Sequence, residues 1–205
     1  MCIRDRGKNN YGQMGDTSVT AKSSPVKISN SRWFEVSCGE NHVAAIDEFN
    51  NLYVWGLNEY GSLGLNTAGP NIYSSPVQTI AGGSNWEKVS CGRYFTAATK
   101  TDGSLWTWGK NQSGEAGIDD DVTIYSPEQV GNTEKYWQAI STKGYATYGL
   151  VGRGSDPIVL KAGSLWGWGN NNGGRLGDGT SPNKSSPVQT SDLTSTWVSV
   201  SAGQE

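Results

Sequence analysis

Short apolar runs separated by clusters of glycine, asparagine, aspartate and proline make up most of the chain. Residues 52–55 read Leu-Tyr-Val-Trp and residues 105–108 read Leu-Trp-Thr-Trp, so every second residue is aromatic and faces one side of a strand. Asp102-Gly103, just before the second run, is typical of a hairpin turn. No helical periodicity competes with this alternation. The pattern therefore predicts an all-β chain of short strands joined by tight turns.

One pattern occurs four times and contains all 9 tryptophans of the chain. In each copy a tryptophan comes shortly before a Val or Ile, which is followed by Ser and then by small residues that end in glycine. In three copies a second pattern is present, in which one or two further tryptophans precede another glycine. The first group is Trp33, Trp86, Trp137 and Trp197, and the second is Trp55, Trp106, Trp108, Trp166 and Trp168. Because a short repeat cannot bury its hydrophobic face alone, successive copies must stack against one another.

A glycine-rich motif of the form Gly-x-Asn-x-x-Gly-x-x-Gly follows the same period. It begins at Gly7, Gly56, Gly109 and Gly169, and a Ser-Pro step follows each copy. The period is about 50 residues, which is typical of propellers and solenoids, and one copy is longer around residues 151–158. Several short strands per repeat predict four-stranded blades arranged around an axis.

Three motifs together resemble the regulator of chromosome condensation repeat family, in the style of its bacterial and viral members. They are Trp-x-x-Val-Ser-Cys-Gly at residues 86–92, Asp-Gly-Ser-Leu-Trp-x-Trp-Gly at residues 102–109 and Ser-Ser-Pro-Val at residues 74–77. The resemblance implies a propeller of typically seven blades. We therefore predict an all-β β-propeller with four-stranded antiparallel blades, about four of which form a partial ring.

The two ends of the sequence differ from the repeat. Residues 1–6 do not show the Leu-x-x-Trp pattern that precedes the glycine motif elsewhere, so we predict a non-native leader there and one repeat domain over residues 7–205. The last residues stop at a point where earlier copies continue. We therefore expect an internal fragment of a longer propeller, with two open flanks.

Composition excludes several classes of function. The net charge is -3 with a pI near 5.2, whereas a nucleic-acid surface is basic, so we expect no nucleic-acid partner. No run of apolar residues is long enough for a membrane helix, so we expect no membrane insertion. The compartment stays open, with a cell or virion surface favoured over the cytoplasm.

The residues of catalytic and metal sites are scarce. His42 is the only histidine, so a zinc site of several imidazoles is impossible and a Ser/His/Asp triad would have to use this residue. The family resemblance instead implies that His42 closes a hydrogen bond at a turn. Asp119-Asp120-Asp121 lacks the spacing of a calcium loop and is interpreted as a solvated turn. We predict no catalytic, cofactor-binding or metal-binding residue, and no enzyme.

The cysteines and tryptophans are interpreted as packing residues. Cys38 and Cys91 occupy the same slot in successive repeats, which predicts small buried side chains, with a disulfide between adjacent blades as the alternative. Each indole buries on the order of 150 to 250 Å², roughly 4 to 6 kcal/mol gross, so tryptophans that recur in every copy favour a core. Exposed tryptophans would instead favour a carbohydrate-binding surface lectin.

Function is expected where the copies differ, on loops that follow the conserved glycine. A rigid scaffold with variable loops is a common recognition surface. The candidate partner-binding residues are Glu40, Asn41, His42, Arg93, Tyr94, Phe95 and Tyr145. The family resemblance implies relatives that include a nucleotide-exchange factor for a small GTPase and a propeller inhibitor of β-lactamases. We predict protein binding through one face of the ring. Exchange-factor activity is the alternative function. The insertion at residues 151–158 is a second candidate contact. Ordinary solvent-facing turns would also explain the candidate residues, and a simple loop extension would explain the insertion.

Overall fold

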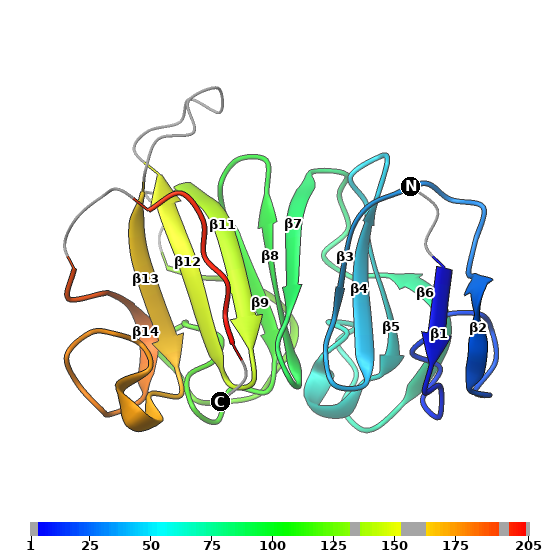
Figure 1. Ribbon diagram of the computed structural model, residues 1–205, viewed down its shortest axis with the longest axis horizontal. Helices are drawn as coiled ribbons and strands as arrows, with labels where there is room; N and C mark the ends of the chain where they lie inside the picture. The colour runs from blue at the N-terminus through cyan, green and yellow to red at the C-terminus, as the bar shows by residue number, and fades with distance from the viewer. Residues whose placement is uncertain (1–3, 132–135, 153–162, 193–196, 204–205) are drawn as a thin grey trace.

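The computed structural model describes residues 4–131, 136–152, 163–192 and 197–203, and in these residues the fold is built from antiparallel sheets that stand side by side (Figure 1). Three sheets have four strands each, as the alternating runs predicted. The first sheet contains β3 (Trp33–Cys38), β4 (His42–Asp47), β5 (Leu52–Leu57) and β6 (Ile72–Gln78). The second contains β7 (Trp86–Cys91), β8 (Phe95–Lys100), β9 (Leu105–Gly109) and β10 (Ile124–Gln129). The third contains β11 (Tyr136–Lys143), β12 (Ala146–Gly152), β13 (Ser164–Gly169) and β14 (Lys184–Gln189).

A fourth sheet has two strands, β1 (Arg4–Gly7) and β2 (Lys22–Lys27). Asp5 lies opposite Val26 in this pair. Residues 4–6, which we expected to lie outside the folded domain, are therefore paired with β2. The non-native origin of residues 1–6 stays a prediction. Within the described residues the chain thus has three four-stranded sheets and one two-stranded sheet, in agreement with the predicted all-β partial ring of about four blades.

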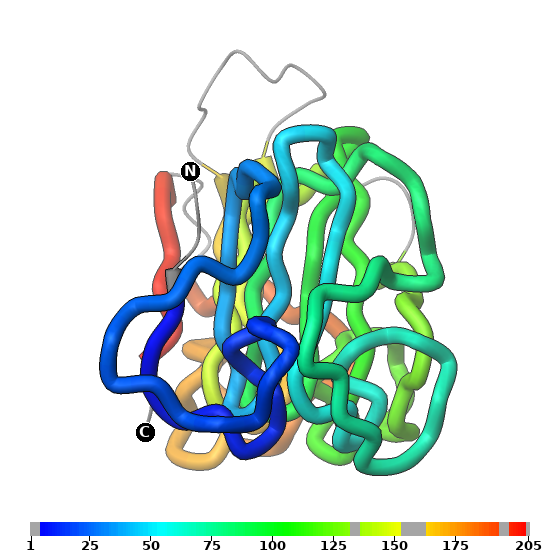
Figure 2. Tube along the Cα trace, turned by 90° about the vertical axis from the view of Figure 1, so that its right-hand side faces the viewer, coloured from blue at the N-terminus to red at the C-terminus, as the bar shows by residue number. Residues whose placement is uncertain are grey.

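Each blade follows the same path, because every strand pairs with the next one in sequence. One end of the blades carries the tight turns after the first strand and the long loops after the third strand. We call this end the turn face; it comprises the turns at residues 39–41, 92–94 and 144–145 and the loops at 58–71, 110–123 and 170–183. It runs along the lower edge of the molecule in Figures 1 and 2. Among the described residues, no helix has the length and apolar character needed to cross a bilayer.

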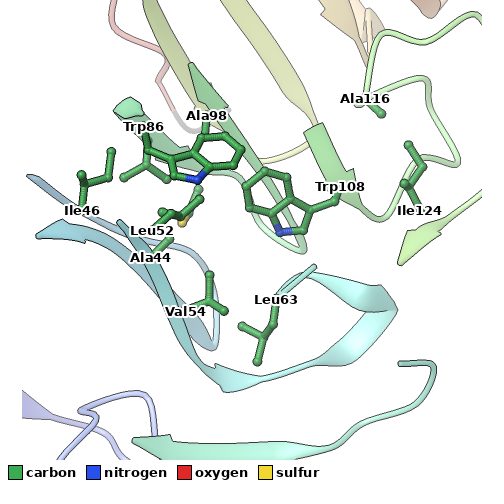
Figure 3. Packing of buried hydrophobic residues seen from close by; sticks show 12 residues of the cluster. Ala44, Ile46, Leu52, Val54, Leu63, Trp86, Ala98, Trp108, Ala116 and Ile124 are labelled. Atoms are coloured by element: carbon green, nitrogen blue, oxygen red, sulfur yellow. The ribbon is translucent and has the colours of Figure 1, made fainter. Parts of the chain in front are cut away.

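The hydrophobic core lies between neighbouring blades. β4 shows why: all six of its residues are buried, because alternate side chains face the blades on either side. Ala44 and Ile46 pack with Trp86 and Trp108 of the next blade (Figure 3), whereas Val43 and Ala45 pack with Trp33 and Trp55 on the other side. Figure 3 shows the two indoles facing the apolar side chains of the preceding blade. The predicted stacking of repeats is confirmed.

Most of the tryptophans are buried at the contacts between neighbouring blades. Six of them are at most 3% exposed, Trp106 and Trp166 are half-buried, and Trp197 is 37% exposed. The predicted shared face of the alternating aromatics is also present, since Trp86 contacts both Trp106 and Trp108 edge to face. The six most buried indoles are Trp33, Trp55, Trp86, Trp108, Trp137 and Trp168.

The indole of the third strand reaches across to the glycine loop of the preceding repeat. Trp55 Nε1 donates to the Gln13 carbonyl and Trp108 Nε1 donates to the Ser62 carbonyl, each at 2.9 Å. The last glycine of the first three loops, Gly15, Gly64 and Gly117, makes room for the ring: a Cβ on Gly64 would lie 2.9 Å from Trp108 Nε1. This close approach explains why the glycine motif and the tryptophan keep the same period.

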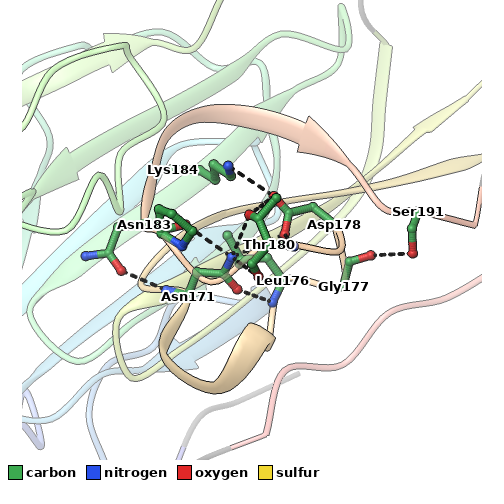
Figure 4. Close-up of polar contacts among 9 residues, drawn as sticks. Asn171, Leu176, Gly177, Asp178, Thr180, Asn183, Lys184 and Ser191 are labelled. Atoms are coloured by element: carbon green, nitrogen blue, oxygen red, sulfur yellow. Dashed lines mark hydrogen bonds and ion pairs between the residues drawn. The ribbon is translucent and has the colours of Figure 1, made fainter.

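A buried asparagine holds each glycine loop in shape. In the third blade the Asn171 side chain accepts the Leu176 N–H at 3.0 Å and donates to the Thr180 carbonyl at 2.9 Å (Figure 4). Asn9, Asn58 and Asn111 occupy the same position and are fully buried as well. Because each amide satisfies both a donor and an acceptor of the loop backbone, the motif requires asparagine at this position.

The two cysteines outside the leader only partly match the expectation. Cys91 is buried, and its Sγ donates to the Ser37 carbonyl at 3.4 Å. Cys38 is exposed, because β3 is the first of the inner strands in the described residues and has no equivalent strand on its other side. Both are free thiols, so the disulfide alternative is not formed in this structure.

Trp108→Ala is expected to destabilise the chain by about 3 to 5 kcal/mol, because it removes a fully buried indole between blades and its hydrogen bond. Trp106→Ala is the matched control, since that indole is half-buried and donates to Ser104 Oγ, just before its own strand. The free energy of unfolding in urea measures both variants. Equal losses would contradict the view that the interface between blades dominates stability.

Gly64→Ala tests the glycine contact separately. Gly64 and Gly82 both have positive φ angles, 62° and 53°, but only Gly64 would place a Cβ against Trp108; Gly82 has open space around it. Each substitution should lower the free energy of unfolding by about 1 kcal/mol, because alanine disfavours the left-handed backbone. Gly64→Ala should lower it by about 1 to 3 kcal/mol more, because the added methyl group overpacks against the indole. Urea midpoints that fall equally would show that contact with the indole is unimportant.

Candidate protein-binding face

The turns of the turn face are equivalent from blade to blade. The carbonyls of Asn41, Tyr94 and Tyr145 accept backbone N–H groups at 2.8 to 3.0 Å from equivalent residues at the end of the third strand or directly after it: Leu57, Lys110 and Asn170. Tyr145 therefore matches Tyr94, although counting from the preceding glycine, Gly92 or Gly144, would match it with Arg93. The difference arises because the glycine stands one residue later in the third blade, so that Lys143 occupies the slot of Gly92 and Gly144 that of Arg93.

A ladder of serine side chains fixes the turns beside one another. Ser37 Oγ accepts the Cys91 N–H and Ser90 Oγ accepts the Thr142 N–H, each at 2.9 Å. Ser141 Oγ accepts the Ala202 N–H at the same distance. The turn backbones add a second set of bonds, from Glu40 N–H to the Arg93 carbonyl and from Arg93 N–H to the Gly144 carbonyl. The turns therefore form a rigid base for their side chains.

Two of the candidate residues point inward rather than to the surface. His42 is 2% exposed and Phe95 is 1% exposed, so neither side chain contacts a partner directly. They occupy equivalent slots at the start of β4 and β8. His42 Nε2 lies 3.0 Å from Thr96 Oγ1, and that hydroxyl donates to the Ser62 carbonyl at 2.9 Å. Because the hydroxyl hydrogen is used in this way, the imidazole N–H donates to Thr96.

His42 is buried in the fold, but its ring does not close the turn as the family resemblance implied. The turn is closed by backbone, from Gly39 N–H to the His42 carbonyl at 2.8 Å, and the ring instead bonds to the next blade. Burial lowers the pKa of His42 to about 4, so the imidazole is neutral at physiological pH.

The other candidates gather around Arg93. Its Nε lies 3.7 Å from Glu40 Oε2, and its Nη1 donates to the Tyr145 hydroxyl at 3.1 Å. The guanidinium carbon also lies 5.2 Å from the ring centre of Tyr94 and 5.6 Å from that of Tyr145. Asn41 is half-buried at the equivalent position of the first blade. Residues from three blades are thus brought together at one place.

Two residues that the sequence did not single out complete the cluster. The Tyr60 and Tyr94 ring centres are 5.5 Å apart, and those of Tyr94 and Tyr145 are 6.4 Å apart. Lys110 Nζ lies 4.7 to 5.8 Å from all three ring centres. We call this cluster the tyrosine patch; it consists of Glu40, Tyr60, Arg93, Tyr94, Lys110 and Tyr145. Tyr60 and Lys110 stand at variable positions of the glycine motif, so the comparison of repeats used for the turns could have found them.

The shape of the patch suits a large partner rather than a small molecule. The cavity beside it measures about 70 Å³ and is lined by the ends of the inner strands, including Glu40, Arg93 and Lys143. Pockets for small ligands usually measure about 300 to 1,000 Å³. Burial also raises the pKa of Tyr94, so its hydroxyl is protonated at neutral pH. The patch therefore offers tyrosine rings and charged side chains beside a hollow that is too small for a typical ligand.

Asp119, Asp120 and Asp121 form a turn on the loop after β9. Asp119 Oδ1 accepts the Ser186 hydroxyl at 3.0 Å, and Asp120 Oδ1 accepts the Val122 N–H at 2.9 Å. In the part of the chain that the structure describes, no three His, Cys, Asp or Glu side chains form a group that could hold a metal ion. Residues 153–162, which include most of the predicted insertion, lie outside the described residues.

Comparison with known proteins identifies the class that the repeated blades define. The model of the Regulator of chromosome condensation (RCC1) repeat matches residues 7–46, 50–99 and 162–205, and a second model of the same repeat matches residues 35–62 and 86–115. The chain belongs to the RCC1 repeat family. The family predicted from the sequence motifs is therefore confirmed.

The similar proteins are longer than this chain. The Ultraviolet-B receptor UVR8 of Arabidopsis thaliana is 31% identical over 196 residues, which cover 91% of this chain and 41% of the relative. The mitochondrial RCC1 domain-containing protein RUG3 of the same plant is 30% identical over 192 residues, covering 89% of this chain and 41% of its own. The chain thus spans less than half the length of these relatives. Whether the parent ring has seven blades stays a prediction.

Solved structures show the same fold. Human WBSCR16 matches with a TM-score of 0.75 and 20% identity, over 94% of this chain and 49% of its own. Prp20p of Saccharomyces cerevisiae matches with a TM-score of 0.79 and 17% identity, over 94% and 47%. The predicted β-propeller architecture is confirmed at the level of the fold.

His42→Phe is expected to remove a pH dependence of stability, because the next repeat has Phe95 in the same slot. The depressed pKa of His42 means that stability is complete above pH 6.5 and is lost as the pH falls toward 4, by about 3 kcal/mol at most. Urea midpoints between pH 7 and pH 5 measure this loss.

The comparison of the two proteins isolates the histidine. Burial raises the pKa of Glu35 and of Glu115, so these carboxyls favour the folded state at low pH and act in the opposite direction. They are the same in both proteins and cancel in the difference. An unchanged pH slope in His42→Phe would contradict a neutral, buried imidazole.

Proposed function

We propose that the chain is a non-enzymatic repeat module that binds another protein through its turn face, with the tyrosine patch as the contact surface. The observation that carries this proposal is the convergence of Tyr60, Tyr94 and Tyr145, one from each of three loops or turns, around two basic side chains. Tyrosine and arginine are the residues most enriched at energetic centres of protein interfaces. A protein partner is also favoured over nucleic acid by the net charge of -3.

The base of the patch supports the same proposal. The serine ladder and the backbone bonds between turns hold the side chains in place before binding. Such an arrangement lowers the entropy cost of association, because fewer rotamers are lost when the partner arrives. The small cavity beside the patch is consistent with a surface contact rather than with a substrate pocket.

The alternatives are distinguished by different observations. The burial of six indoles speaks against a lectin that stacks sugars on tryptophan. Exchange-factor activity requires a bound small GTPase to release its nucleotide, so acceleration of GDP release from a panel of small GTPases would favour that function over simple binding.

Selection from a random displayed-peptide library tests the proposal without knowledge of the partner. Selected peptides are expected to lose about 30-fold in affinity for Arg93→Ala and for Tyr94→Ala, since each removes a central contact of about 2 kcal/mol. Phe49→Ala is the matched control: Phe49 is 68% exposed on the turn between β4 and β5, at the opposite end of the blade. Peptides that depend on Phe49 and not on the patch would contradict the proposal.

A further inference from the structure

We infer that proton uptake by Glu115 regulates the turn face: the neutral carboxyl closes the interface between the second and third blades, and the ionised carboxylate loosens it. This inference rests on the proposed function, since Tyr145 comes from the third blade and the rest of the tyrosine patch from the first two. It depends on the surroundings of Glu115, on a comparison with Gln13 and on the path from Glu115 to Tyr145.

The Glu115 carboxyl is enclosed in this interface and only partly satisfied. The residue is 0% exposed, its Oε2 accepts the Ser113 N–H at 2.7 Å, and its Oε1 has no hydrogen-bond partner among the described residues. A buried carboxylate is costly unless donors surround it. Burial is the largest cause acting on the pKa of Glu115 and raises it, whereas the N–H groups of Glu115 and Ser113 and the charge of Lys110 act in the opposite direction. The site therefore favours the neutral carboxyl.

Gln13 shows that the same slot accommodates a neutral side chain. It stands at the equivalent position of the first glycine loop, and its Oε1 accepts the Tyr11 N–H at 3.0 Å, just as Glu115 Oε2 accepts an N–H two residues earlier. In the Gln13 loop the backbone carbonyl also accepts Trp55 Nε1 at 2.9 Å. At Glu115 the corresponding indole, Trp168, has no partner for its Nε1 among the described residues. The neutral side chain thus accompanies the more complete interface.

The elements around Glu115 bring few charges to the carboxyl. On its own loop, Lys110 is the charged side chain that acts on it. Asp119 of the same loop accepts a hydroxyl of β14 at 3.0 Å, and Lys184 of β14 pairs with an aspartate at 3.2 Å, so both are engaged elsewhere. β12 presents the uncharged Thr147 hydroxyl. The charge state of Glu115 is therefore determined mainly by its burial, and burial depends on closure of the interface.

A short path leads from Glu115 to the tyrosine patch. The Glu115 carbonyl accepts the Thr147 hydroxyl at 3.0 Å, and Thr147 follows Tyr145 by two residues at the start of β12. The Tyr145 ring centre lies 6.4 Å from that of Tyr94 and 4.7 Å from Lys110 Nζ, both of which belong to the second blade. Movement of the third blade away from the Glu115 loop would separate Tyr145 from these two residues. Closure of the interface thus assembles the patch.

The direction of the pH dependence follows from the raised pKa. A carboxyl of this kind contributes its full stabilisation below the ordinary value of 4.5, and the contribution is lost as the pH rises through the raised value. The interface is therefore tightest at acid pH and opens more often at pH 8. Glu35, whose pKa burial raises, acts in the same direction, and His42, with a pKa lowered to about 4, acts in the opposite one. Both are present in every variant compared below.

Hydrogen exchange of the full chain at pH 5 and pH 8, corrected for the intrinsic exchange rate, measures opening of the third blade without any partner. Glu115→Gln is expected to slow exchange in β12 and β13 about tenfold at pH 8, because a buried charge without a full set of partners is removed, and to change little at pH 5. Glu128→Gln is the matched control, since Glu128 is exposed on β10 of the second blade. Equal or faster exchange in Glu115→Gln at pH 8 would overturn the inference.

Gln13→Glu is the reciprocal variant, which places a carboxyl in the equivalent slot of the first loop. Because Gln13 is half-buried, a smaller effect is expected: exchange in β4 and β5 should become several-fold faster at pH 8 than at pH 5, with the third blade unchanged. This variant also tests the inference if Glu115→Gln does not fold. Exchange in the first blade that stays independent of pH would show that a carboxyl in this slot does not control the interface.

Fluorescence anisotropy with a library-selected peptide connects the interface to binding. The unchanged protein and Glu128→Gln should bind several-fold more tightly at pH 5 than at pH 8, and Glu115→Gln should bind equally well at both, because its interface stays closed. If Glu115→Gln keeps the pH dependence of the control while the peptide requires Arg93 and Tyr94, the regulation is wrong and the proposed function stands. If the peptide depends on Phe49 while exchange responds to Glu115→Gln, the proposed function is wrong and the proton-linked interface stands.

Discussion

The contact between the third-strand tryptophan and the glycine loop of the preceding repeat is the interaction on which the rest of the structure depends. It joins two segments that belong to different repeats, as with Trp108 and the loop that contains Ser62 and Gly64. A single blade has no apolar interior of its own, because both faces of its inner strands need a neighbour. Removal of this contact would therefore separate blades rather than loosen one blade. The same requirement explains why tryptophan, glycine and the buried asparagine keep a common period.

Packing between blades determines the interior, and the exposed positions of the turn face differ from repeat to repeat. The slot of Asn41 holds tyrosine in the next two blades, and the backbone carbonyl there makes the same hydrogen bond in all three. Main-chain groups thus perform the structural role, which leaves the side chain free to change. The Tyr94, Tyr145 and Lys110 cluster is a consequence of this division, because neighbouring turns lie close enough for side chains of successive repeats to meet.

The sequence predicted the fold well because its signals are local and repeated: alternating aromatics, hairpin turns and the glycine motif each appear several times. The site was predicted only in part. Glu40, Arg93, Tyr94 and Tyr145 were found as variable turn residues, but the burial of His42 and Phe95 depends on the next blade. The equivalence of Tyr145 with Tyr94 was missed because the residues were counted from the glycine, which stands one residue later in the third blade; the pairing register corrects this. Tyr60 and Lys110 meet across repeats, and no pattern within one repeat indicates that contact.

Glu115 shows how far a repeat tolerates departure from its own rules. It occupies the slot of Gln13 and Ser62 and is fully buried. Among the described residues its Oε1 has no hydrogen-bond partner, and neither has Trp168 Nε1. Its carbonyl still accepts a hydrogen bond, from the Thr147 hydroxyl at 3.0 Å. The main-chain contact is thus kept, but the indole bond that Trp55 and Trp108 make to the loop carbonyl is not repeated at Trp168. Stability is therefore distributed unevenly, and the interface that carries Tyr145 has the least complete polar pairing of the three.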